Sequence, residues 1–289
     1  MPVFAPRSLD EALAVVAENP EAELLAGGTD FMVEVNARVR RPRSVVSLTG
    51  VPELRGWRRE GADIVLGSML TYREMLERGL AHLVPGLAQA ARTVGSPQIR
   101  NAGTLGGNIA TASPAGDTLP VLEALGAVVV VGHGDLDHRL VRLDELVTGP
   151  KRTCLRPGDL ITAIRVPASH GHQEFLKIGR RNAMVVSLAS VACVLDFPGR
   201  TARLALGAVG PTVIRPREAE ELLSSRLLWE ERRLPEPVVD IPEIVDLVRR
   251  AAAPIDDHRS SGAYRLHAVG ICADRALRRA LSEEKRVAA

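Results

Sequence analysis

Two pairs of adjacent glycines constrain this chain more than any other feature, because each pair interrupts an apolar stretch where the backbone must bend. The first pair lies within LLAGGTDF, residues 24–31, and the second within TLGGN, residues 104–108. Glycine accepts positive φ and has no Cβ atom to keep a ligand away from backbone N–H groups. Both pairs are predicted to open onto the N-terminus of a helix.

Helix N-termini with free N–H groups attract phosphate. At the first pair the Thr29 hydroxyl is a further donor, and hydroxyls of Thr104, Thr111 and Ser113 accompany the backbone donors of the second pair. Asp117 follows, and its carboxylate suits the hydroxyls of a ribityl or ribose group. One pair alone is as typical of a bend without a ligand. The two pairs, roughly 80 residues apart, together predict a diphosphate held from two sides.

Neither glycine pair carries the fingerprint of an ordinary nucleotide-binding fold. No GxGxxG follows the first predicted strand, and no GxxxxGK[ST] occurs in the sequence, so Rossmann and P-loop folds are disfavoured. The formal net charge is only +2, which gives no general attraction to nucleic acid.

The length of 289 residues and the order of the predicted elements indicate an α+β chain of two domains. Helices are predicted at 8–19, 31–39, 71–79, 85–94, 118–126, 212–223, 242–253 and 264–281. Strands are predicted at 22–26, 44–48, 63–67, 127–131, 160–166, 174–179 and 202–209. Residues 95–117 are predicted to form a long functional loop, and residues 226–242, with Pro235 and Pro237, an exposed excursion.

Cysteine usage points to a reducing compartment, and the cytoplasm is the expected location. Cys154, Cys193 and Cys272 are odd in number and widely spaced, so they predict neither a disulfide framework nor an iron–sulfur cluster. No apolar run approaches the ~20 residues of a membrane helix, and the histidines fit no zinc pattern, so no metal site is predicted. A basic cluster is predicted to be a solvated face, with docking of an acidic partner or balancing of bound phosphates as the alternatives: Arg38, Arg40, Arg41 and Arg43.

The segments LLAGGTDF at 24–31 and IRNAGTLGGNIATASPAGD at 99–117 closely resemble the FAD-binding medium subunits, or middle domains, of the molybdenum hydroxylases, the family of xanthine dehydrogenase and carbon monoxide dehydrogenase. The resemblance continues through DLITAIRVP at 159–167, FLKIGRRNAM at 175–184 and DDHRSSGAYRLHAVGICADRAL at 256–277.

This resemblance implies a fold of the p-cresol methylhydroxylase (PCMH) type. An FAD-binding domain would span residues 1–168, with two α/β lobes at about 1–55 and 56–168. A C-terminal α+β domain with a three-stranded antiparallel sheet would span residues 169–289.

The resemblance also implies which residues contact FAD. The two glycine segments would wrap its pyrophosphate, Asp117 would bind its hydroxyls, and three further positions match flavin contacts of the family. The implied cofactor-binding residues are Leu24, Leu25, Ala26, Gly27, Gly28, Thr29, Asp30, Phe31, Val94, Thr104, Leu105, Gly106, Gly107, Asn108, Asp117, Ile161 and Lys177. The flavin is expected to be non-covalent, because neither glycine segment contains His, Cys or Tyr.

By the same resemblance the chain is an oxidoreductase subunit that transfers electrons, and no catalytic residue is assigned. A large molybdopterin subunit would hydroxylate the substrate, and a small subunit with [2Fe–2S] clusters would pass the electrons to FAD on this chain. NAD or a quinone would accept them. The implied assembly is a dimer of heterotrimers, with neither nucleic acid nor a membrane span. Two alternatives stay open: a self-sufficient flavin-dependent reductase on a related fold, and a nucleotide-binding scaffold without redox work.

Overall fold

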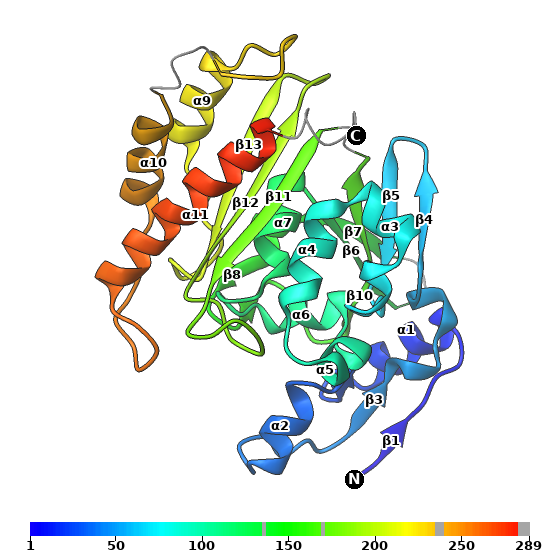
Figure 1. Cartoon of the computed structure of the whole chain (residues 1–289). Helices are drawn as coiled ribbons and strands as arrows, with labels where there is room; N and C mark the ends of the chain where they lie inside the picture. The colour runs from blue at the N-terminus through cyan, green and yellow to red at the C-terminus, as the bar shows by residue number, and fades with distance from the viewer. Residues whose placement is uncertain (135–136, 169–170, 235–239, 283–289) are drawn as a thin grey trace.

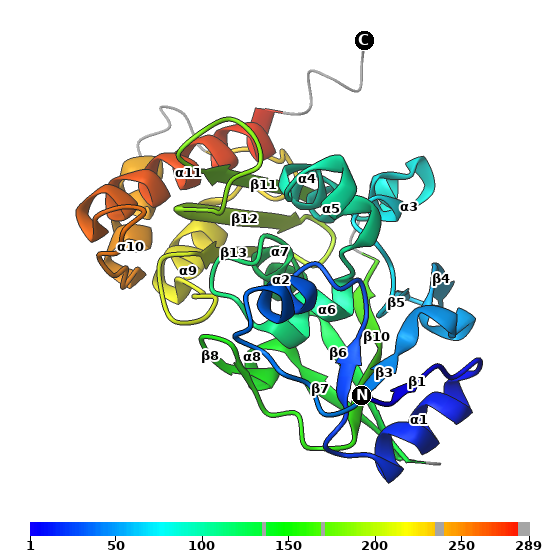
Figure 2. The same cartoon turned by 90° about the horizontal axis from the view of Figure 1, so that it is seen from below.

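The computed structural model describes residues 1–134, 137–168, 171–234 and 240–282. Its strands form three main sheets that follow one another along the chain, each with helices packed against it (Figure 1). Most of the first lobe and the C-terminal domain lie at opposite ends of the molecule, with the five-stranded sheet and its helices between them (Figure 2). The predicted α+β architecture, including the C-terminal three-stranded antiparallel sheet, is confirmed.

The first lobe is a small parallel sheet with α1 packed against it. It contains β1 (Val3–Phe4), α1 (Leu9–Glu18), β2 (Glu23–Leu25), α2 (Phe31–Asn36), β3 (Val45–Ser47) and the 3₁₀ turns η1 (Leu48–Gly50) and η2 (Pro52–Leu54). The strand order is β1-β3-β2. Ser8 caps α1 by accepting a hydrogen bond from the Glu11 N–H, as its sequence predicts. The first glycine pair therefore lies between β2 and α2.

The second lobe is built on a five-stranded antiparallel sheet of order β4-β5-β10-β6-β7. These strands are β4 (Trp57–Glu60), β5 (Asp63–Gly67), β10 (Asp159–Pro167), β6 (Val128–His133) and β7 (Asp137–Arg142). The other elements are η3 (Glu74–Leu76), α3 (Arg78–Leu83), α4 (Pro85–Thr93), α5 (Pro97–Ala102), α6 (Leu105–Thr111), α7 (Thr118–Leu125), α8 (Leu143–Leu146) and the small hairpin β8 (Val147–Gly149) and β9 (Arg152–Thr153). The sequence analysis missed β4 and β7, because both are edge strands rich in charged residues.

The predicted long loop at 95–117 is wrong, because two short helices occupy most of it. Ser96 caps α5, with Pro97 in its first turn, and Thr104 caps α6 by accepting a hydrogen bond from the Gly107 N–H. The single helix predicted at 71–79 is also wrong. The 3₁₀ turn η3 lies within this region, and α3 begins near its end. Helices of six or seven residues are too short to show a periodic apolar face.

The C-terminal domain pairs β11 (His172–Ile178), β12 (Ala189–Asp196) and β13 (Thr201–Gly207) in that order. The helices α9 (Arg217–Arg226), α10 (Asp240–Ala251) and α11 (Gly262–Ser282) complete it, and α11 crosses the sheet (Figure 1). Cys193 and Cys272 are buried in its core. Residue 169, the first of the predicted domain, and Pro235 and Pro237 of the predicted excursion lie outside the described residues.

Within the described ranges, no helix is both long enough and apolar enough to cross a membrane.

Candidate cofactor-binding groove

The two glycine pairs meet in space. A Cβ atom built on Gly27 would lie 1.9 Å from the carbonyl oxygen of Ala102, so the first bend packs directly against the chain that leads into the second. Residues of both segments line one cavity. They are Leu24, Ala26, Gly27, Gly28, Thr29, Asp30 and Phe31 from the first and Thr104, Gly107 and Asn108 from the second.

At the first pair, four successive backbone donors have no partner. The N–H groups of residues 27–30 make no hydrogen bond to any described residue. Gly28 has φ +72°, a left-handed conformation that other residues adopt only with strain. Residues 27–29 are half-buried and Asp30 is exposed. Since N–H groups withdrawn from solvent are almost always satisfied, this row of open donors indicates a place for an anionic ligand.

The N–H groups of the second pair, in contrast, are all used within the protein. Gly106 donates to the carbonyl oxygen of Ser68 (2.8 Å), and Gly107 donates to Oγ1 of Thr104 (3.1 Å). The expectation that both pairs offer backbone donors is therefore wrong for the second pair. Its contribution to the cavity is space: a Cβ on Gly107 would lie 2.8 Å from Thr104 Oγ1 and 3.9 Å from Ala26 Cβ, both on cavity-lining residues.

The central cavity continues in two directions to form one groove. On one side lies an apolar slot that shares Leu24, Ala26, Gly107 and Ala110 with the central cavity. Its other lining residues include Leu48, Met69, Leu155, Leu160 and Ile161. On the other side lies a third cavity that shares Thr29, Asp30, Tyr72 and Asn108 with the centre and is also lined by Val94, Asp117 and Val185.

Tyr72 is a groove residue that the sequence analysis missed. Its side chain is buried and lines both the central and the third cavity. Its hydroxyl makes no hydrogen bond to the described residues, so it is open to a ligand. Burial, with smaller contributions from Asp117 and Asp30, raises the pKa of Tyr72 above its ordinary value, which keeps the phenol a neutral donor.

Arg40 is the member of the basic cluster that reaches the groove. It pairs with Glu23 (2.8 Å) and Glu34 (3.4 Å), and its guanidinium lies over the ring of Phe31, 5.0 Å from the ring centre. Arg40 lines the central cavity, so the predicted solvated face does not hold for this residue.

Asp117 and Lys177 form a buried ion pair at the far end of the groove. Lys177 Nζ donates to Asp117 Oδ2 (2.6 Å) and to the carbonyl oxygens of Thr93 (3.0 Å) and Val185 (3.1 Å), so all three ammonium protons have acceptors. Ser187 donates to the other Asp117 oxygen. This network, here called the Asp117 clamp, joins β11 and the segment after it to the ends of α4 and α7.

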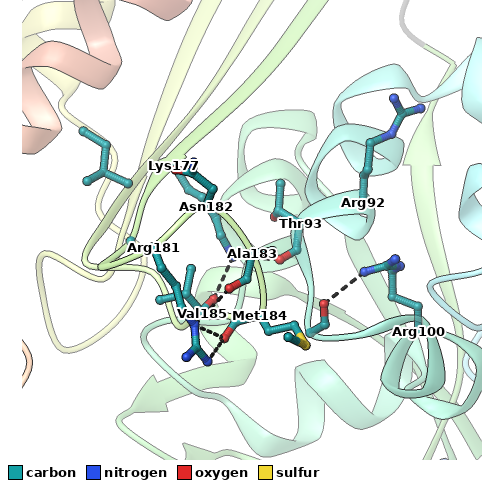
Figure 3. A pocket seen from close by; sticks show the side chains of 12 residues that line it. Arg92, Thr93, Arg100, Lys177, Arg181, Asn182, Ala183, Met184 and Val185 are labelled. Carbon is teal, nitrogen blue, oxygen red and sulfur yellow. Dashed lines mark hydrogen bonds between the residues drawn. The ribbon is translucent and has the colours of Figure 1, made fainter.

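A fourth cavity lies beside the Asp117 clamp and shares Gly95, Met184 and Val185 with the third cavity. Figure 3 shows Lys177 and Arg181 on one side of it and Thr93 and Arg100 on the other. Arg181 donates to the carbonyl oxygens of Ala183 and Met184, which fixes the turn of the chain that forms this wall.

Fifteen of the seventeen residues implied as cofactor contacts line this groove, because the two predicted segments and the three outlying positions converge on it. Leu25 and Leu105 line none of the four cavities. Leu105 is fully buried in the core of the second lobe. The Leu25 side chain lies next to Gly28, within van der Waals distance of where a Cβ of Gly28 would be.

The groove fits an adenine dinucleotide. A planar base suits the apolar slot, phosphates suit the unpaired N–H groups of residues 27–30, and hydroxyl-rich groups suit the Asn108 amide and the Tyr72 hydroxyl. The site is therefore that of a dinucleotide-binding protein without a Rossmann fold.

The comparisons with known proteins agree with this class. Residues 1–169 match the model of the FAD binding domain in molybdopterin dehydrogenase, and residues 174–280 match that of the CO dehydrogenase flavoprotein C-terminal domain. The carbon monoxide dehydrogenase medium chain of Afipia carboxidovorans is 30% identical over 97% of this chain and 96% of its own. A putative xanthine dehydrogenase FAD-binding subunit of Escherichia coli is 30% identical over 91% of this chain and 89% of its own.

A solved structure, reconstituted CO dehydrogenase from Oligotropha carboxidovorans, superposes with a TM-score of 0.87 at 29% identity and covers 98% of both chains. The chain belongs to the family of FAD-binding medium subunits of the molybdenum hydroxylases. It is thus a subunit of an oxidoreductase.

Proposed function

We propose that this chain binds FAD in the groove described above and serves as the electron-transfer subunit of a heteromeric molybdenum hydroxylase. The observation that carries the proposal is the meeting of two glycine segments, far apart in sequence, at one cavity with four unpaired N–H groups. When bound, FAD supplies storage for two electrons between one-electron clusters and an external acceptor.

The residues of the groove would divide the binding between them. Residues 27–30 would hold the pyrophosphate with their N–H groups, and Val94 would contact the flavin. Leu24 and Ile161 line the apolar slot, so we propose that they pack on the adenine, in place of the pyrophosphate and flavin contacts that the resemblance implies for them. The Asp117 clamp fits a positioning role, because Lys177 has all its donors engaged within the protein. It would hold the Val185 segment at the wall of the third cavity.

The partners follow from family membership and from the chain's cysteines, which are free and only three in number, fewer than the four thiolates of an iron–sulfur cluster. We propose a small subunit with [2Fe–2S] clusters and a large molybdopterin subunit, assembled as a dimer of heterotrimers in the cytoplasm. The acceptor would be NAD or a quinone. We further propose that residues 1–168 form the FAD-binding domain, in lobes 1–55 and 56–168, and residues 169–289 the C-terminal domain.

The test is to express the chain alone and together with its two partner subunits and to record flavin spectra without oxygen. We expect FAD in the complex and bleaching of its absorbance when the hydroxylase substrate is added. A chain that, without partner subunits, passes electrons from NADH through its FAD to an organic substrate over many turnovers would be the self-sufficient reductase instead. A complex that contains no flavin would contradict the proposal.

A further inference from the structure

A second cavity, away from the groove, lies where the second lobe meets the C-terminal domain. The end of α7, the first turn of α8, the start of β6 and the ends of β7 and β10 form one wall, and β13 with the start of α9 forms the other. It shares no lining residue with the four groove cavities. Its volume of about 360 Å³ lies at the lower end for small-molecule sites. We call it the junction pocket.

Four arginines and two carboxylates line the junction pocket: Arg142, Arg203, Arg215, Arg217, Glu123 and Asp144. Two of the arginines are already engaged. Arg142 Nε donates to Asp144 (3.0 Å), and Arg215 Nε donates to the buried Glu220 (2.6 Å).

The other two arginines have donors left. The Arg203 side chain makes no hydrogen bond or ion pair with any described residue, although its backbone pairs with β12. Arg217 has a single long contact of 3.4 Å to Glu220. An arginine side chain carries five N–H donors in a planar fork that matches phosphate or carboxylate, so this pair offers an open anion site.

The position of Arg203 is set by the end of α7. Its Nη1 lies 2.7 Å from where a Cβ of Gly126 would be, and Gly126 has φ +72° at the C-cap. The positive φ favours glycine at this position, and a Cβ there would displace the tip of the Arg203 side chain. The carbonyl end of a helix attracts a cation, so Arg203 is held in the pocket without an acid as its partner.

The Glu123 carboxylate is the second group in the pocket whose hydrogen-bonding capacity is not used within the protein. Its residue is 6% exposed, and its nearest cation is Arg215, at 3.9 Å, beyond hydrogen-bond range. No described residue donates a hydrogen bond to it. Burial, followed by the charge of Asp144, raises the pKa of Glu123 above its ordinary value. Glu123 lines the pocket, and neither of its oxygens is among the fully enclosed atoms without a partner, so its carboxylate is open to a hydroxyl or amino group of a ligand.

We propose that the junction pocket binds a small anionic metabolite whose phosphate or carboxylate group is held by Arg203 and Arg217 and whose hydroxyl or amino group pairs with Glu123. Arg203 belongs to β13 and Glu123 to α7, so the bound anion links the C-terminal domain to the second lobe. This ligand is separate from FAD and independent of electron transfer.

The test is calorimetric titration of the assembled complex with inorganic phosphate at constant ionic strength. We expect one saturable site per chain. Arg203→Gln should weaken binding roughly tenfold or more, the cost of a charge-assisted hydrogen bond. Arg250→Gln is the matched control, because Arg250 is exposed on α10, has no partner among the described residues and does not line the pocket; it should bind as the parent does.

A second variant tests whether the negative charge of Glu123 weakens phosphate binding. Glu123→Gln removes a negative charge beside the anion, so phosphate binding should strengthen roughly fivefold. If Arg203→Gln does not fold, Arg217→Gln, at a half-exposed side chain, takes its place. Equal affinity of the parent and both arginine variants would overturn the proposal. Phosphate binding that is present in the isolated chain and lost in the complex would also overturn it, since a partner subunit would then fill the pocket.

Discussion

The two glycine pairs share a sequence pattern but contribute differently to the groove. The first leaves the N–H groups of residues 27–30 unpaired, whereas the second donates its own to Ser68 and Thr104. The first pair is therefore the anion-binding half of the cradle. The second is a rigid helix start that leaves space.

Within each pair the two glycines also differ. A Cβ on Gly27 would overlap the Ala102 carbonyl oxygen at 1.9 Å, and one on Gly106 would lie 2.8 Å from the Ser68 carbonyl oxygen. Gly28 and Gly107 have no such backbone contact. In each pair, one glycine lets two chain segments pack together, and the other leaves room or permits a conformation. In a pair of adjacent glycines, one position thus allows close packing of two chain segments and the other helps to shape the ligand site.

The largest effect is expected for Gly27→Ala. The new methyl group would collide with the backbone at Ala102, so the two segments must separate. We expect a loss of up to about 3 kcal/mol in the free energy of unfolding, typical of severe overpacking, together with loss of FAD. Urea unfolding of the flavin-free chain measures the first effect and flavin absorbance the second. A stable, FAD-loaded variant would show that the segments do not need this contact.

Gly107→Val tests the space that the second pair leaves. Its side chain would enter the central cavity beside Ala26 and push the phosphate away from the N–H groups of residues 27–30. Loss of one charge-assisted hydrogen bond to those groups would weaken FAD binding roughly 10- to 150-fold. Because the new Cβ would lie 2.8 Å from the Thr104 Oγ1 that caps α6, the cap must shift, and we expect a loss of about 1 kcal/mol in the free energy of unfolding. Gly107→Ala should give an intermediate affinity in fluorescence titrations. Affinity that does not depend on side-chain size would remove residue 107 from the site.

The parts of this groove that the sequence predicts are those formed by residues close to one another along the chain. The glycine segments were found because their chemistry is local: a strand, a bend and a small-residue run are visible in consecutive letters. The outlying residues Val94, Ile161 and Lys177 came only from family resemblance. The Asp117–Lys177 pair joins residues 60 positions apart, and nothing in a single sequence indicates that each satisfies the other.

Other misses have local causes. The sequence within 95–117 does contain capping signals for both helices: Ser96 before Pro97, and Thr104 before Gly107. The two helices are short and α6 contains two glycines, so their composition is more typical of a loop. Leu105 was assigned to the cofactor with its neighbours, but the first turn of α6 directs it into the core. A contiguous motif does not imply that every residue in it faces the same way.

Gly28→Ala separates strain from binding at the first pair. A residue other than glycine at φ +72° costs about 1–2 kcal/mol, and any relaxation would move the open N–H groups. Gly56→Ala is the matched control, because Gly56 has φ +68° and no atom within 4 Å of its built Cβ. Both variants should lose similar stability in urea, and only Gly28→Ala should lose FAD affinity. Equal affinities would mean that the first pair is not the anion-binding half.

The smallest effect is expected for Thr104→Val. The substitution keeps the shape of the side chain but removes the oxygen that accepts the Gly107 N–H at 3.1 Å, and loss of an N-cap costs about 1 kcal/mol of stability. Thr104→Ser, which keeps the oxygen, should remain near the parent in thermal unfolding. Because the Thr104 hydroxyl supports α6 and not the ligand, FAD affinity should fall less than in Gly28→Ala. A larger fall would make Thr104 a direct ligand, and the division of labour between the two glycine pairs would have to be abandoned.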